Sequence, residues 1–416
     1  MISIIAVPFA EKFLTEDNLS PFAILQHWMH ESTRFCLGHV RPCNISWSEN
    51  TLMISNYKLN IDQFKQFVLE ELRLLEESVY RDVLLGIVPE DVGISCALTD
   101  SMDNGDKVTP GYGPFNSPED KTLDNEDSAK FERALGTLGD RSFVRIVDGR
   151  VEYDLEKSTA WMASVHASLQ HAYGLMHTLA GLAGRGTEES LIQHTNEELG
   201  AARNVEIAKG TIQLNMAYHK NAIETGLFKF IIRILPYRLA RIFFILLRVT
   251  RPVELGALLR LFIKGSDAKQ LSRKIVQLYR IRVFVSWGRA WDADDLSSIL
   301  KKWFKDGLGI PMGLRMYRHV ATAIARIYLR YHLVDDTETL QAAADAQAGR
   351  NQKTSHINYA VEKKPNRTKR VQDMELISVH WDGFFGVETY PSPEEEVGKR
   401  SDNKIGRERC KTKMEE

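Results

Sequence analysis

The sequence is poor in cysteine. Its 416 residues include only Cys36, Cys43, Cys96 and Cys410. Their spacing fits neither a zinc site nor the dense disulfide framework of a small secreted domain. Scattered cysteines are typical of proteins that work in a reducing compartment, so we expect an intracellular protein.

Long uncharged hydrophobic runs are missing as well. The most apolar stretch, residues 226–249, is interrupted by Lys229, Arg233, Pro236, Arg238 and Arg241. A membrane-spanning helix needs about 20 nearly uncharged residues, so this stretch does not qualify. The apolar residues 1–8 also lack the basic residues that precede a secretory signal. These absences predict a soluble protein with no membrane partner.

Several enzyme signatures are absent too. The sequence contains no P-loop, no HExxH pair, no GxSxG nucleophile elbow and no dinucleotide-binding fingerprint. It also lacks helicase motifs, so any helicase associated with it would be a separate protein. We expect no small-molecule cofactor and no bound metal.

Opposite charges are unevenly distributed along the chain. The formal net charge of −1 argues neither for nor against a nucleic-acid partner. Residues 1–200 hold 16 Lys/Arg and 31 Asp/Glu, a balance of −15, whereas residues 220–332 hold 22 Lys/Arg and 7 Asp/Glu, a balance of +15. A basic half favours DNA, because cations that neutralise phosphates release counterions. A solvated basic face, or two halves that pair within the fold, would give the same composition.

The first half predicts short strands and long helices. Residues 45–59 alternate between apolar and polar side chains, which indicates a hairpin or short strands. Residues 61–85 have apolar residues at three- and four-residue spacing, which predicts a helix, and residues 157–181 predict another. Residues 143–153 contain a turn at Asp148-Gly149, and residues 100–127 are rich in Asp, Gly, Pro and Ser, which is typical of a flexible linker.

The second half predicts a hairpin followed by helices. Val205 to Ile207 and Thr211 to Ala217 flank Lys209-Gly210, which is a hairpin signal. Residues 227–335 are predicted to be mostly helical, with a loop at residues 307–311. Residues 363–370 form a basic run that would suit a nuclear localisation signal, a DNA contact or an ordinary charged linker.

Six segments of the chain carry a recognisable order of residues. They are Gly184-Arg185-Gly186-Thr187-Glu188, Tyr218-His219-Lys220, Arg233-Ile234-Leu235-Pro236, Leu314-Arg315-Met316-Tyr317-Arg318, Ala348-Gly349-Arg350 with Tyr359-Ala360, and Ser378 to Gly386. In this order they resemble the tyrosine recombinase (integrase) superfamily, and within it the fungal proteins related to Crypton-type elements. Similar regions accompany telomere-linked RecQ-like helicases in fungi. The resemblance covers about Asn44 to Val387.

The resemblance implies a chemistry for these residues. Arg185 and Arg318 would hold the scissile phosphate, because guanidinium groups grip phosphate oxygens bidentately. Lys220 would protonate the leaving 5′-oxygen as a general acid, and Tyr359 would attack phosphorus to form a 3′-phosphotyrosyl bond. Retaining the bond energy in that ester removes any need for ATP or a metal.

Two positions depart from the superfamily pattern. Arg315 stands where the superfamily usually has His or Lys, although Arg is often found there in the fungal relatives. Arg350 stands where a His or Trp is expected, and arginine does not transfer protons near neutral pH. Losing one transition-state donor costs about 10²–10³ in rate. The sequence therefore leaves open an active recombinase or an inactive, domesticated DNA-binding or scaffold protein.

Each proposed catalytic residue also has an ordinary structural explanation. Arg185 and Glu188 could form a simple surface ion pair, Lys220 could be solvated, and Tyr359 could pack beside Ile357. A protein-interaction module without a DNA role would carry the same residues.

The resemblance implies a mainly α-helical fold with a small β-hairpin or sheet. We expect a mostly helical N-terminal domain (residues 1–100), an acidic linker (101–128), a recombinase-like catalytic domain (129–360), a basic run with a closing aromatic segment (361–390) and a disordered tail (391–416). The expected partner is double-stranded DNA. We expect the protein to act in the nucleus and to bind DNA as a homo-oligomer, as members of the superfamily do.

Overall fold

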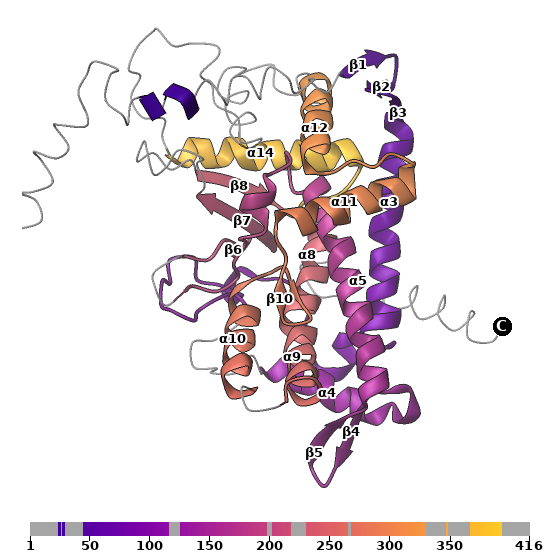
Figure 1. The fold of residues 1–416 in the computed structure, drawn as a ribbon, viewed down its shortest axis with the longest axis vertical. Helices are drawn as coiled ribbons and strands as arrows, with labels where there is room; N and C mark the ends of the chain where they lie inside the picture. The colour runs from indigo at the N-terminus through magenta and orange to yellow at the C-terminus, as the bar shows by residue number, and fades with distance from the viewer. Residues whose placement is uncertain are drawn as a thin grey trace, which may run out of the picture.

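The computed structural model is mainly helical and carries small antiparallel sheets (Figure 1). It describes residues 24–25, 27–29, 45–115, 125–197, 202–217, 230–264, 268–329, 347 and 367–392. The predicted mainly α fold class is confirmed at this level. Within the described residues, no helix is long and apolar enough to cross a membrane.

The N-terminal part begins with a three-stranded sheet and a long helix. Strands β1 (Ile45–Ser48), β2 (Thr51–Ile54) and β3 (Tyr57–Asn60) pair antiparallel, as the alternation of residues 45–59 predicts. Asn60 then caps helix α3 (Ile61–Ser78), because its side chain accepts hydrogen bonds from the backbone N–H groups of Asp62 and Gln63, 3.0 Å each. The helix continues as a π-helical turn, η1 (Val79–Val83). The strands and the helix predicted here are confirmed.

The predicted flexible linker is held in place where it is described. The Asp103 carboxylate accepts hydrogen bonds from the Arg203 side chain (2.7 Å) and from the backbone N–H of Ile207 (3.0 Å). The Asn196 side chain donates to the carbonyl oxygen of Lys107 at 2.9 Å. The backbone also approaches closely, since a Cβ added to Gly113 would lie 2.1 Å from the carbonyl oxygen of His194. Composition alone predicted a loop correctly but missed these contacts. The predicted boundary at residue 128 stays a prediction.

A hairpin and the longest described helix follow. Strands β4 (Val144–Val147) and β5 (Arg150–Tyr153) meet at the predicted Asp148-Gly149 turn. Helix α5 (Leu155–Leu179) has its N-cap at Asp154, whose side chain accepts from the backbone N–H of Lys157 at 2.9 Å. Its last two turns are buried on all sides, as expected of a helix at the centre of a core.

A second sheet holds strands β6 (Val205–Ala208), β7 (Thr211–Ala217) and β8 (Phe230–Ile234), paired antiparallel in that order. The sequence predicted the β6–β7 hairpin correctly and missed β8, which lies in a region assigned to helices. A five-residue segment with four apolar residues and one arginine has no period that separates a buried strand from a buried helix.

The remaining described elements are mostly helices, as predicted for residues 227–335. They are α4 (Glu126–Thr137), α6 (Gly186–Glu189), α8 (Tyr237–Phe244), η5 (Ile245–Thr250), α9 (Arg251–Leu261), α10 (Ala268–Ile281), β9 (Val285–Ser286), β10 (Arg289–Ala290), α11 (Ala293–Leu308), α12 (Leu314–Tyr328) and α14 (Arg367–Phe385), with short 3-10 turns η2 (Pro89–Val92), η3 (Asp100–Met102) and η4 (Gly139–Arg141). The predicted loop near residue 309 is confirmed, because Gly309 ends α11 with a φ of 69°. The predicted closing aromatic segment lies at the end of α14.

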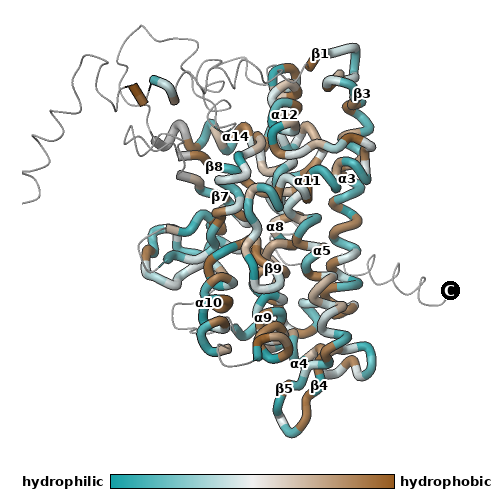
Figure 2. Tube along the Cα trace, viewed as in Figure 1, coloured by the Kyte–Doolittle hydropathy of each residue, from teal (hydrophilic) through white to brown (hydrophobic). Residues whose placement is uncertain are grey.

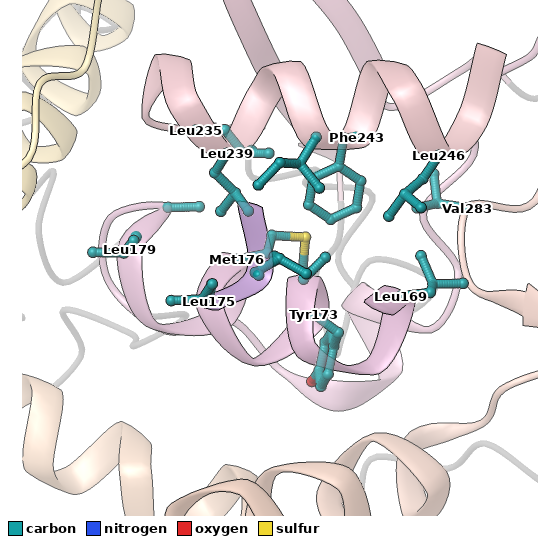
Figure 3. Packing of buried hydrophobic residues seen from close by; sticks show 14 of the residues in the cluster. Leu169, Tyr173, Leu175, Met176, Leu179, Leu235, Leu239, Phe243, Leu246 and Val283 are labelled. Carbon is teal, nitrogen blue, oxygen red and sulfur yellow. The ribbon is translucent and has the colours of Figure 1, made fainter. Parts of the chain in front are cut away.

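A single hydrophobic core joins the N-terminal helix to the rest. Figure 3 shows α5 packed against α8 and η5, with Met176 facing Leu239 and Phe243. The Phe64 ring of α3 lies 6.3 Å from Phe304 of α11 and 5.3 Å from Phe385 of α14 between ring centroids. Helix α3 is therefore part of the same core as the helices that follow it.

Several charges of the acidic and basic halves pair within the fold. Side chains of Arg238, Arg241 and Arg248 form ion pairs with Glu76, Glu90 and Asp127, respectively. Partly exposed ion pairs of this kind each stabilise a fold by only about 0–1 kcal/mol. They show, however, that intramolecular pairing accounts for part of the charge asymmetry in the sequence.

We expect Phe64→Ala to destabilise the whole protein by about 3–5 kcal/mol, because a buried ring is replaced by a cavity. Urea denaturation should show one cooperative transition at a lower midpoint. Leu74→Ala, an exposed position of the same helix, is the control and should change stability by less than about 0.5 kcal/mol. A separate early transition in the Phe64 variant would mean that α3 unfolds independently.

Candidate functional site

The described structure contains half of the predicted catalytic residues. Arg185, Arg315 and Arg318 are described, whereas Lys220, Arg350 and Tyr359 lie outside the described residues. The geometry of the site is therefore built from the arginines and from what surrounds them.

Arg185 stands at the N-cap of helix α6, as its motif predicts. The carboxylate of Glu188 accepts a hydrogen bond from the backbone N–H of Arg185 at 3.3 Å and lies 3.7 Å from its side-chain Nε. Glu188 is almost fully buried, while the Arg185 side chain keeps 29% of its surface exposed. The buried acid thus orients a guanidinium that still reaches solvent.

The glycines on both sides of Arg185 allow close packing. A Cβ on Gly184 would lie 2.6 Å from Oε1 of Glu189, and one on Gly186 would lie 2.5 Å from Cδ1 of Leu314. Leu314 is the first residue of α12, which carries Arg318 one turn further on. Glycine at these positions lets the Arg185 segment approach the start of α12, so the two predicted phosphate-binding arginines come from segments in direct contact.

Arg318 lies within the electrostatic field of Arg185. Burial lowers the pKa of Arg318, and the positive charges of Arg185 and Arg233 lower it further. Glu188 and Glu189 act in the opposite direction. The positive charges of Arg185 and Arg318 therefore repel each other, and the buried carboxylates of Glu188 and Glu189 partly offset this repulsion.

Arg315 lies one turn before Arg318 on α12 and is exposed. The three-residue spacing puts both arginines on neighbouring positions of the helix surface. No described contact fixes the Arg315 side chain to Arg185 or to the buried acids.

Glu189 is the centre of a buried network under the arginines. Its carboxylate accepts hydrogen bonds from the Tyr173 hydroxyl and from Nδ1 of His177, 2.8 Å each. Burial raises the pKa of Glu189, but His177, Arg233 and the Tyr173 hydroxyl outweigh burial, and the net pKa is lowered. Glu189 is thus a carboxylate, and the same network raises the pKa of Tyr173 through burial and the Glu189 charge.

Arg233 and Gln347 join the arginine segment to the sheet and to α14. The buried Arg233 side chain donates to the carbonyl oxygens of Leu182 (3.0 Å) and of Gln347. The Gln347 side chain accepts from the backbone N–H of Leu182 (2.9 Å) and donates to the carbonyl oxygen of Ile232 (2.8 Å). Gln347 is fully buried and lies three residues before Arg350 in the sequence.

Sequence reasoning missed Tyr173, His177, Glu189 and Gln347. Tyr173 and His177 are four residues apart on a predicted helix, so they share a face, and Glu189 follows the Arg185 motif directly. These were available signals. Gln347 gave none, because its contacts lie far away in the chain.

The arrangement suits an anion rather than a metal. Among the described residues, no group of three His, Cys, Asp or Glu side chains could hold a metal ion. The exposed edge of the site presents arginine, and its acids are buried beneath and already bonded. Planar guanidinium groups in such a pair bind phosphate or carboxylate groups well.

We expect Glu189→Gln to lower the free energy of unfolding by about 3 kcal/mol at pH 7, because it leaves buried cations without their carboxylate. A lowered folded-state pKa contributes stability above the unfolded value of about 4.3, and this stability is lost as pH falls through the folded value. The gap between wild type and variant should therefore narrow in acid. Chemical denaturation from pH 3 to pH 8 measures this, with Glu388→Gln at an exposed position as the control. An equal stability at pH 7 would contradict a charged Glu189.

Comparisons with known proteins add no relative to this description. The chain matches no family model, no curated protein and no solved structure. We therefore base the functional assignment on the arginine site and on the order of the sequence motifs.

Proposed function

We propose that the chain is a DNA-binding protein of the tyrosine recombinase type, which cleaves and rejoins DNA strands through a 3′-phosphotyrosyl intermediate. The observation that carries this proposal is that the segments of Arg185 and Arg318 are in direct contact, next to the buried Glu188 and Glu189. The two arginines come from distant parts of the sequence, and both belong to motifs that resemble the same family.

A phosphodiester fits this pair on electrostatic grounds. Each arginine lowers the free energy of an anion placed between them, and the anion in turn removes their mutual repulsion. The buried acids fix the guanidinium groups before the substrate arrives, and prearranged charge is what stabilises a phosphoryl transition state.

The proposed reaction balances without a cofactor. The phenolic oxygen of Tyr359 bonds to phosphorus and gives its proton to water, the bond between phosphorus and the 5′-oxygen breaks, and Lys220 gives that oxygen a proton, which it regains from water. The product is a 3′-phosphotyrosyl ester and a free 5′-hydroxyl. Attack of a 5′-hydroxyl on the ester reverses the step and rejoins the strand.

Two of the remaining predicted residues lie close in the sequence to described parts of the site. Lys220 follows the end of β7 by three residues, and Arg350 follows Gln347 by three residues. Strand β7 pairs with β8, which carries Arg233, and Arg233 binds Gln347.

Nuclear localisation and assembly of a homo-oligomer on double-stranded DNA belong to the same proposal.

A second candidate is an inactive DNA-binding or scaffold protein. Arg350 at the position of the expected His favours it, since arginine keeps the charge but transfers no proton near neutral pH. This candidate predicts salt-sensitive binding to DNA without cleavage.

Tyr359→Phe should abolish a covalent protein–DNA adduct and leave the affinity for DNA nearly unchanged, because only the attacking oxygen is removed. The measurement uses labelled, nicked duplexes from the genomic flanks of the gene, followed by a denaturing gel. Tyr57→Phe, a surface tyrosine of β3, is the matched control and should form the adduct normally. If no protein forms an adduct but binding fades with salt, the inactive candidate is favoured. An adduct in the Tyr359 variant would show that another residue attacks.

Arg318→Gln should slow adduct formation by about 10²–10³, because a transition-state donor is lost from the site. Arg326→Gln, an exposed position in the last turn of the same helix, changes the net charge equally and should have little effect. Single-turnover rates at saturating DNA separate this effect from weaker binding. Equal rates for the two variants would remove Arg318 from the active site.

A further inference from the structure

Helix α10 presents a basic, partly aromatic surface well separated in sequence from the arginine motifs. Its inner face is anchored by Ile275 and Tyr279, while most of its other side chains are at least partly exposed. Figure 2 shows both hydrophilic and hydrophobic residues along this helix. We call the following residues the α10 surface: Phe262, Lys264, Lys269, Leu271, Arg273, Lys274 and Trp287.

The charge of this surface is one-sided. Between residues 255 and 291 the sequence has eight Lys/Arg and a single acid, Asp267, and α10 itself contains no acid. Lys269 lies in the first turn, where the helix dipole disfavours a cation, and Arg273 follows it at four-residue spacing. No ion pair among the described residues involves Lys264, Lys269, Arg273 or Lys274. These unpaired positive charges lower the stability of the start of α10, and a bound polyanion would offset that cost.

Two aromatic rings lie beside these cations. Trp287, at the β9–β10 turn, and Phe262, at the end of α9, meet edge to face with ring centroids 6.1 Å apart. Their exposed fractions are 39% and 41%. Position 288 lies against Ile275, since a Cβ on Gly288 would be 3.3 Å from Cδ1 of Ile275. The turn that carries Trp287 therefore packs against α10, and Phe262 lies two residues before the exposed Lys264 in the chain, which places both rings next to the basic helix.

The backbone under Trp287 is strained. Its φ is +52°, in the left-handed region that Gly and Asn adopt most easily. Of the other described non-glycine residues with a positive φ, Glu49, Ser55, Asp148 and Lys209 carry polar side chains and Leu85 carries a half-buried aliphatic one, whereas Trp287 carries an exposed aromatic ring. An exposed bulky ring at a position where a smaller residue would cost less indicates that the ring itself is used.

We propose that the α10 surface binds single-stranded nucleic acid, with Lys264, Lys269, Arg273 and Lys274 contacting phosphates and with Trp287 and Phe262 stacking on bases. Aromatic side chains beside a basic track are the usual means of binding unpaired strands. A duplex keeps its bases stacked inside and offers little for exposed rings to contact. This binding is independent of the Arg185–Arg318 site and goes beyond the function proposed for it.

The first test replaces Trp287, whose backbone lies in the left-handed region. Trp287→Asn suits the left-handed backbone, so its melting temperature should equal or exceed that of wild type. Its affinity for a fluorescein-labelled 12-nucleotide oligothymidine, measured by anisotropy, should fall about tenfold. Trp287→Phe keeps a ring and should retain most of the affinity. An unchanged affinity in the Asn variant would refute stacking by Trp287.

The second test removes positive charge from α10. Changing Lys269, Arg273 and Lys274 together to Gln should make the slope of log affinity against log salt shallower by about 2, because each contact with a single strand contributes about 0.7. The control changes Lys301, Lys302 and Lys305 of α11, all exposed, to Gln and alters the net charge equally. Equal slopes for the two triple variants would overturn the phosphate contacts.

The same experiments distinguish single-stranded nucleic acid from other ligands. A 12-base-pair duplex that binds as tightly, with the same loss in the charge variant but none in Trp287→Asn, would replace the proposal with a duplex contact. Binding to phosphatidylserine vesicles but not to the oligonucleotide would assign the surface to membranes. Trp287→Asn should form the covalent adduct on nicked duplexes as wild type does, so failure of the recombinase proposal would be seen separately.

Discussion

The site is organised by the need to satisfy a buried charge on Arg233. This guanidinium is almost fully removed from solvent, and burial lowers its pKa while Glu188 and Glu189 act against that effect. Its hydrogen bonds go to the carbonyl oxygens of Leu182 and Gln347, which belong to different segments of the chain. An unsatisfied buried charge would cost several kcal/mol, so these segments are fixed relative to one another. The loop that carries Arg185 inherits its position from that requirement.

The same requirement gives the site its charge. Arg185, Arg233 and Arg318 are opposed by Glu188 and Glu189, which leaves three cations against two anions and a formal excess of +1 before His177 is considered. Because the acids are buried and bonded, the excess appears at the partly exposed Arg185 and Arg318. The structural ion network and the proposed anion site are therefore one arrangement, in which the buried residues support the partly exposed arginines.

The parts of the fold that could be predicted from the sequence are those whose signals are local. The hairpins at Asp148-Gly149 and Lys209-Gly210 and the helix starting at Ile61 follow from turn residues and periodicity. Strand β8 has no such signal, since its five residues, four of them apolar, owe their conformation to pairing with β7. Gln347 is fixed by residues more than a hundred positions away, so no pattern near it in the sequence predicts its role.

Charge composition is the weakest of the sequence arguments for a DNA partner, and the structure shows why. The balance of +15 in residues 220–332 includes Arg238, Arg241 and Arg248, which pair with acids of the other half. It also includes Arg251, whose guanidinium is buried and donates to the carbonyl oxygens of Arg282 and Val283 at 2.7 Å each. Such charges help to hold the fold together. The cations available to the proposed polyanionic partner are the smaller exposed set on α10 and α12, where location rather than number supports binding.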